Sequence, residues 1–165
     1  MTTTQEKINR VLWEAADTFR GKIDSSIYKD YILVMLFVKY MSDVHKERRA
    51  VYEKRYEGNE ERINRAMSRE RFILDETSTF DYLYDERTNP EIGVLINKAL
   101  GNIEDTNATK LRGVFRNIDF NSEAVLGSTR ERNTMLRNVL EDFKKLDLQP
   151  SQLEDEDIID RKSVV

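Results

Sequence analysis

The chain has 165 residues, a formal net charge of −4, one histidine and no cysteine. This length fits one domain, and the lack of cysteine excludes disulfides, thiolate zinc sites and cysteine nucleophiles. Apolar residues at 39% are too many for a disordered chain and charged residues at 35% too many for a membrane protein, so we expect a soluble cytoplasmic protein.

The first predicted helix begins at a capping box, in which Thr3 and Glu6 each satisfy a backbone N–H group of the other. Gly21 is placed to end this helix, because glycine adopts the left-handed conformation of a helix C-terminus at little cost. An apolar stripe at spacings of three and four predicts the buried face, which consists of Ile8, Val11, Leu12, Ala15, Ala16 and Phe19.

The second predicted helix begins near Ser25 or Ser26 and ends at Gly58. Residues 31–41 are apolar on nearly every side. A strand is the alternative for such a run, but the surrounding stretch has no breaker and is too long for a strand. Because a helix that is apolar all round is a buried one, we expect a long central helix that turns polar beyond His45 and projects toward solvent.

Shorter helices and loops are predicted for the rest of the chain. Asn89-Pro90 is expected to start a helix, with Asn89 as its cap, and Ser128 with Glu131 forms a second capping box. No strand signal is present, so the predicted fold class is all-α, a single helical domain around the central helix. The other expected segments are a surface helix at 60–71, a loop at 72–79, a helical turn at 80–84, irregular chain at 107–127 with a short turn at 111–115, and a third capping box of Ser151 and Glu154 after Pro150.

No residue is predicted to be catalytic, to bind a cofactor or to hold a metal. The six glycines lie at least eight residues apart, which excludes Gly-x-Gly and Walker-type phosphate loops. His45 lies near Asp43 and Glu47, and a surface or capping histidine is favoured over a catalytic one. The acidic run 154–157 lacks the spaced ligands of a calcium loop and is interpreted as a solvated helix start.

Charge is distributed unevenly along the chain. Residues 44–74 and 109–140 each carry a net charge of +3, although the whole chain is acidic. In 44–74 the glutamates alternate with arginines at helical spacing, which favours ion-paired, solvated helices. In 109–140 the basic residues, Arg132 among them, meet few acids, so this region is the better candidate for phosphate contacts. The candidate DNA-backbone residues are Lys110, Arg112, Arg116 and Arg130.

Several strings of residues carry a family resemblance. The most specific are Leu12-Trp13-Glu14-Ala15-Ala16-Asp17 with Arg20-Gly21, Tyr28-Lys29-Asp30-Tyr31, and Phe37-Val38-Lys39-Tyr40-Met41-Ser42-Asp43. Later strings are Phe80-Asp81-Tyr82-Leu83, Ile92-Gly93, Asn97-Lys98-Ala99-Leu100, Ile103-Glu104, Leu111-Arg112-Gly113-Val114-Phe115 and Asp119-Phe120. From about Ile8 to Ile159 the chain closely resembles the N-terminal helical domain of type I restriction-modification methylase subunits, the HsdM family.

The resemblance implies a role in DNA modification. In that family the modification subunit transfers a methyl group from S-adenosylmethionine to the N6 of an adenine in DNA. It works with a specificity subunit, a second modification subunit and a restriction subunit. The N-terminal helical domain helps close the subunits around double-stranded DNA and carries no methyl-transfer residues. The resemblance thus implies such a domain at residues 1–159 and a cofactor only in a separate catalytic domain. The charge balance predicts weak DNA binding by this domain alone, and the composition predicts no membrane contact.

Two departures bear on catalysis. The family's Asn-Pro-Pro-aromatic motif holds a flipped adenine, but the only Asn-Pro here is Asn89-Pro90, followed by Glu91, and a glycine-rich cofactor loop is missing. Family members usually continue past the region of Asp157-Ile158-Ile159 with a glycine and a helix that lead into the catalytic domain. Residues 160–165 depart from that pattern, and we expect either an excised domain or a truncated reading frame.

Two other classes of function stay open. One is a stand-alone helical adaptor that binds only protein. For the aromatic cluster of Phe80, Tyr82 and Tyr84, packing in the core or at an interface is favoured over stacking on bases. The other class is a small enzyme, and the chain offers it neither a nucleophile, nor a metal set, nor a phosphate loop.

Overall fold

The structure, a computed structural model, describes residues 2–115 and 118–153. All regular elements in these ranges are helical apart from one isolated parallel β-bridge between Thr3 and Leu153, which confirms the all-α prediction. No helix in the described ranges is long and apolar enough to cross a membrane. The elements are α1 (Gln5–Phe19), α2 (Ser25–Arg55), α3 (Glu60–Met67), α4 (Phe80–Asp85), α5 (Ile92–Thr106), α6 (Ala108–Leu111), α7 (Glu123–Leu126), α8 (Thr129–Lys144) and the 3₁₀ turn η1 (Pro150–Gln152).

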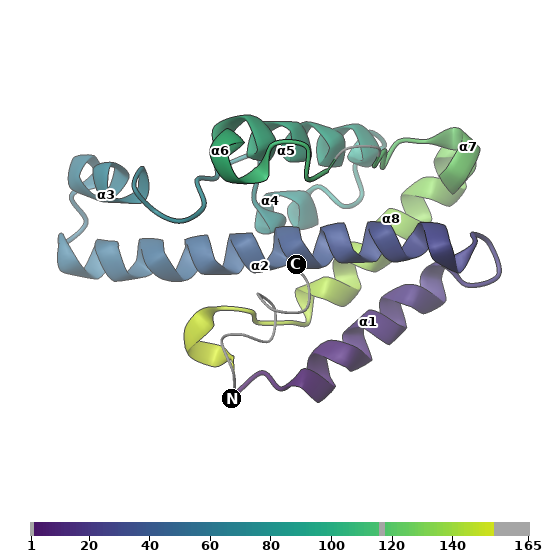
Figure 1. Cartoon of the computed structure of the whole chain (residues 1–165), viewed down its shortest axis with the longest axis horizontal. Helices are drawn as coiled ribbons and strands as arrows, with labels where there is room; N and C mark the ends of the chain where they lie inside the picture. The colour runs from purple at the N-terminus through teal and green to yellow at the C-terminus, as the bar shows by residue number, and fades with distance from the viewer. Residues whose placement is uncertain (1, 116–117, 154–165) are drawn as a thin grey trace.

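Helix α2 runs through the molecule between its neighbours (Figure 1). Helices α5 and α6 lie along one side of α2 and α1 along the other, while α8 crosses α2 and contacts α1, α4 and α5. Every residue from Met35 to Val44 is buried, as the apolar run predicts. Beyond His45 the helix leaves this core and packs on α3 through a separate small cluster of Tyr52, Ile63 and Met67.

The start of α1 differs from the prediction. The cap is Thr4, whose side chain accepts a hydrogen bond from the Lys7 N–H, so the predicted box of Thr3 and Glu6 is wrong. Thr3 is buried and is hydrogen-bonded to the segment after α8 instead. Its hydroxyl donates to the Asp147 carbonyl at 2.6 Å and its N–H donates to the Gln152 carbonyl. Thr3 therefore makes long-range contacts, although local spacing predicts that it caps α1.

Helix α5 starts later than predicted. Its cap is Glu91, and Asn89-Pro90 lies in a turn before the helix. The Asn89 side chain accepts from the Glu91 N–H at 2.8 Å, so it caps this turn rather than the helix. Ser128 caps α8 as predicted, by accepting from the Glu131 N–H.

Parts of the C-terminal predictions lie outside the described residues. Ser151 lies in η1, but its predicted partner Glu154, the acidic run 154–157 and the departing tail 160–165 are not among them. Two short helices, α6 and α7, occupy the stretch 107–127 that we expected to be irregular.

Candidate nucleic-acid interface

The segment that follows α6 carries Arg112 and is fastened to α5 by one carboxylate. Glu104 on α5 accepts hydrogen bonds from the backbone N–H groups of Gly113 at 3.2 Å and Phe115 at 2.9 Å. Gly113 has a φ of +77°, a left-handed conformation that glycine adopts without strain. The Phe115 ring is buried 6.2 Å from that of Phe37 on α2. The segment is therefore anchored at this end by both polar and apolar contacts.

The other end of the segment rests on the start of α5. The Asn97 side chain accepts from the Phe120 N–H at 2.9 Å and donates to the Asp119 carboxylate at 2.8 Å. The Tyr31 hydroxyl donates to the Asp119 carbonyl, and burial together with the Asp119 charge raises the pKa of this tyrosine. A Cβ atom at Gly93 would lie 2.7 Å from the Phe120 carbonyl oxygen. Only glycine allows the backbone to approach so closely.

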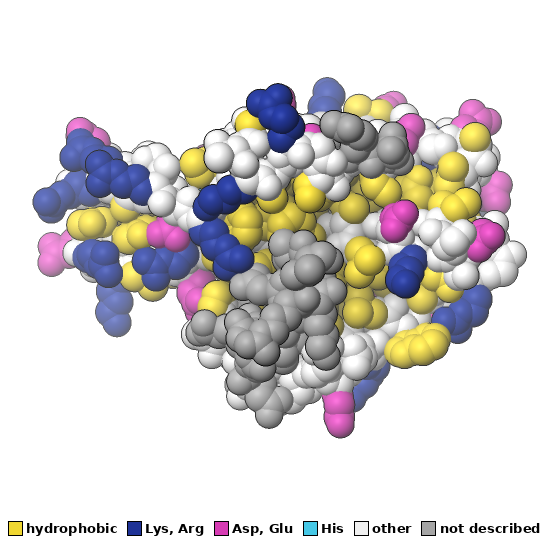
Figure 2. Space-filling model, in the orientation of Figure 1, with side chains coloured by type: hydrophobic (Ala, Val, Ile, Leu, Met, Phe, Trp, Pro, Cys, Tyr) yellow, Lys and Arg dark blue, Asp and Glu magenta, His cyan; other side chains and the backbone are white. Residues whose placement is uncertain are grey.

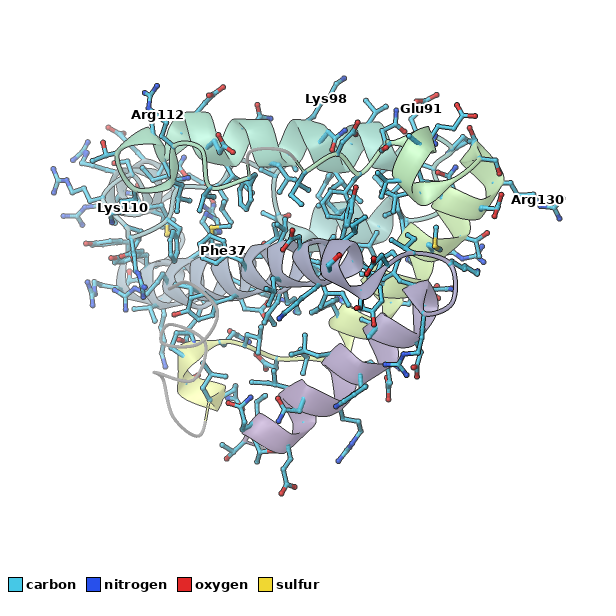
Figure 3. All side chains as sticks on the ribbon, turned by 45° about the vertical axis from the view of Figure 1, so that its right-hand side comes forward. Phe37, Glu91, Lys98, Lys110, Arg112 and Arg130 are labelled. Atoms are coloured by element: carbon cyan, nitrogen blue, oxygen red, sulfur yellow. The ribbon has the colours of Figure 1, made fainter. Side chains whose placement is uncertain are left out.

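The structure separates the predicted phosphate-contact residues into two places. Lys110 is exposed and donates to the Arg71 carbonyl at 3.2 Å, and Arg112 is exposed beside it. Figure 3 shows these two at one end of the molecule and Arg130 at the other end, at the start of α8. Arg116 lies outside the described residues. Lys110 and Arg112 thus share one surface that Arg130 does not reach.

Arg132 is not a surface cation, contrary to its place among the basic residues of 109–140. Its side chain is buried and donates to the Gly127 carbonyl at 3.2 Å and to the Thr129 hydroxyl at 3.4 Å. The guanidinium therefore braces the turn that leads into α8. Sequence reasoning also passed over Lys98, which is exposed on α5 and lies between Arg112 and Arg130 in Figure 3.

Residues 37–43, one of the strings that carry the family resemblance, supply buried polar contacts at the centre of α2. The Asp43 carboxylate pairs with Lys39 at 3.0 Å and accepts from the Leu148 N–H at 2.7 Å, and the Ser42 hydroxyl accepts from the Phe80 N–H at 2.8 Å. Burial raises the pKa of Asp43 despite the lysine beside it. These side chains join α2 to α4 and to the segment after α8, so their role is structural.

His45 lines a cleft of about 870 Å³ between the outer half of α2, α3 and the loop before α4. Burial and the nearby charge of Arg49 lower the pKa of His45, which favours its neutral form. Two ion pairs line this cleft: Lys46 pairs with Asp81, and Arg49 pairs with Glu60. No group of three or more metal-ligating side chains gathers in residues 2–115 and 118–153.

The aromatic cluster packs inside the domain, which was the favoured interpretation. Phe80 is fully buried, and its ring stacks on that of Tyr84 with centroids 6.5 Å apart. The Tyr84 ring is in turn covered by the Arg87 guanidinium at 4.0 Å and the Lys144 ammonium at 4.8 Å. These contacts occupy the ring and do not leave it as an open platform for bases.

Comparison with known proteins assigns the family. The family model of the HsdM N-terminal domain matches residues 8–143. The crystal structure of the type I restriction-modification system methyltransferase subunit from Streptococcus thermophilus is similar, with a TM-score of 0.68 and 25% sequence identity. The match covers 86% of this chain and 34% of that chain, so this chain spans about a third of that subunit. No curated protein matches. The chain belongs to the family of HsdM N-terminal domains.

Proposed function

We propose that the chain serves as the N-terminal domain of a type I restriction-modification modification subunit and helps that subunit close around double-stranded DNA. The observation that carries this proposal is the family match over residues 8–143, supported by the similar fold of a solved methyltransferase subunit. Methyl transfer to adenine N6 and binding of S-adenosylmethionine then belong to a catalytic domain outside this chain.

The proposed DNA contacts are to phosphate. Arg112 projects from the segment whose backbone is held by Glu104, and Lys110 lies just before it in α6. A fixed backbone loses little entropy when its side chains bind. Arg116 belongs to the same proposal, and Arg130 would make a separate contact from the start of α8. Phosphate contacts position a protein without reading bases, so the specificity subunit would select the target.

The proposal also includes assembly with the specificity subunit, a second modification subunit and the restriction subunit. A groove of about 300 Å³ between α1 and α2 supports a protein contact. Trp13, 62% exposed, and the exposed Leu33 line it. The same groove favours the alternative function, a helical adaptor that binds protein and never touches DNA.

A mobility-shift titration with duplex DNA separates the two functions. If the domain helps the subunit close around DNA, it should bind duplex DNA weakly and non-specifically, with a dissociation constant near or above about 10⁻⁴–10⁻⁶ M. This binding should weaken as salt is added. If no shift appears even at low salt, the protein-binding adaptor is the remaining function. Calorimetric titration with S-adenosylmethionine should be flat, and a micromolar dissociation constant would overturn the assignment of the cofactor to a separate domain.

A further inference from the structure

We infer that the outer end of α2 together with α3 forms a second phosphate-binding surface for duplex DNA. We call residues 48–71 the α2–α3 arm. This inference rests on the proposed function, because it takes DNA as the partner, but it assigns the contact to residues that the sequence had marked as ion-paired. The arm contains eight arginine and lysine residues and five glutamates, a net charge of +3.

Only some of the arm's cations have an acidic partner. Arg48 pairs with Glu70 and Arg65 with Glu61, in line with the ion-paired helices that the spacing predicts. Figure 2 shows Lys and Arg side chains gathered over this projecting end of the molecule. Among the described residues, four exposed cations of the arm have no carboxylate within ion-pair distance: Lys54, Arg55, Arg62 and Arg69.

Tyrosine rings hold two of these four cations in place. The rings of Tyr52 and Tyr56 stack with centroids 6.1 Å apart. The Arg55 guanidinium lies 5.4 Å from the Tyr52 centroid, and the Arg62 guanidinium lies 5.3 Å from the Tyr56 centroid. Both distances are within the range of a cation–π contact. Such a contact restrains the guanidinium while its N–H donors stay free, and those donors match the bidentate geometry of a phosphate. The arm therefore presents two pre-positioned phosphate donors.

The tip of the arm lies well beyond the buried core of α2. Val44 ends the continuous buried part of α2, and Arg55 lies eleven residues further along the helix. At about 1.5 Å per residue this is about 17 Å. Charges in physiological salt are screened over about 8 Å. A duplex at the tip of the arm would thus be screened from the more distant acids of the chain, although two acids outside the arm, Asp75 and Glu76, line the cleft beside it.

The test compares two double variants of the 165-residue chain. Arg55→Gln/Arg62→Gln removes the stacked cations of the arm. Arg10→Gln/Lys22→Gln removes two exposed cations of α1 and the turn that follows it, and so makes the same change in net charge elsewhere. Affinity for a fluorescently labelled duplex is measured by anisotropy across salt concentrations, and circular dichroism shows that each variant is folded.

The arm variant should bind more weakly than wild type and with a flatter salt dependence. Loss of two phosphate contacts makes the slope of log K against log salt shallower by about 1.8. Between about 50 and 200 mM salt, the affinity of wild type should therefore decrease by a factor about 12 times larger than that of the arm variant. The control variant should keep most of the wild-type slope. Arg55→Lys/Arg62→Lys, which keeps the charge, should restore the slope.

The outcomes separate this inference from the proposed function. If wild type binds DNA and the arm variant matches wild type or the control, the arm is not a DNA surface, while the proposed function stands. If wild type binds no duplex at the lowest salt, both the proposed function and this inference are overturned.

Discussion

The Asp43 carboxylate, in the middle of α2, accepts a hydrogen bond at 2.7 Å from the backbone N–H of Leu148, which lies 105 residues away in sequence. Both residues are buried. The contact fixes the segment after α8 on the central helix, close to the place where Thr3 bridges Leu153. The segment after α8 is thus held by Asp43 on the central helix and by Thr3 near the N-terminus.

Removing the charge of Asp43 should destabilise the domain strongly. Asp43→Asn keeps the shape of the side chain but leaves the buried Lys39 ammonium without its counter-charge, which costs about 3–5 kcal/mol when one partner of a buried pair is lost. Urea unfolding followed by circular dichroism measures the loss. Asp30→Asn, at an exposed position of the same helix, is the control and should change stability by less than about 0.5 kcal/mol. Equal effects of the two substitutions would contradict the structural role of Asp43.

Phe37 tests whether α2 is the packing centre of the fold. Its ring is buried, edge-on to Phe72 at 6.0 Å and tilted against Phe115 at 6.2 Å. Phe37→Ala should cost about 3–5 kcal/mol of unfolding free energy. Leu33→Ala on the exposed face of the same helix should cost far less. A loss below about 1 kcal/mol for Phe37→Ala would mean that α2 does not carry the core.

Two glycines of α5 should respond to alanine with opposite signs. At Gly93 the added methyl group would lie 2.7 Å from the Phe120 carbonyl oxygen, so Gly93→Ala should destabilise by about 1–3 kcal/mol. At Gly101 nothing lies within 4 Å, so Gly101→Ala should stabilise the helix by about 0.5–1 kcal/mol. Thermal melting of both variants checks the difference, and a stabilised Gly93→Ala variant would mean that the loop does not rest on α5.

The helices were predictable where the information is local. Apolar spacing predicted the buried faces of α1 and α2, because one stripe or an all-round apolar surface fixes what a helix must bury. Helix starts were less predictable. Thr3 is drawn into a contact with Asp147 and leaves the cap to Thr4, while Asn89 caps a turn. Both differences depend on the chain around the residue rather than on spacing.

The candidate site was predictable only in part, because it depends on contacts between distant segments. Charge counts found Lys110 and Arg112, but they placed Arg130 in the same set, although the fold puts it at the opposite end. No local pattern marks Glu104 as the anchor of the following segment. The unpaired cations of the arm were not predicted, because the Arg62 guanidinium lies over the Tyr56 ring instead of pairing with a glutamate.

Charge reversal at Arg112 and Arg116 should weaken DNA binding equally on all sequences. Phosphate contacts carry no base information, so target choice should stay unchanged while the salt slope falls. The measurement is duplex affinity in a full modification assembly, where the other subunits raise the effective concentration of these contacts. Arg10→Glu/Lys22→Glu, at exposed cations outside this region, is the matched control. An unaltered affinity and slope in the Arg112→Glu/Arg116→Glu assembly would remove this surface from the DNA path.

The central claim is that this domain helps a modification subunit close around DNA. Its most direct test is whether the chain binds duplex DNA through phosphate without reading the base sequence. Dissociation constants of the 165-residue chain are measured for two unrelated duplexes of equal length over a series of salt concentrations. The proposed function predicts weak binding with the same affinity and the same negative salt slope for both duplexes. No binding at the lowest salt, or affinity that salt does not change, would contradict it.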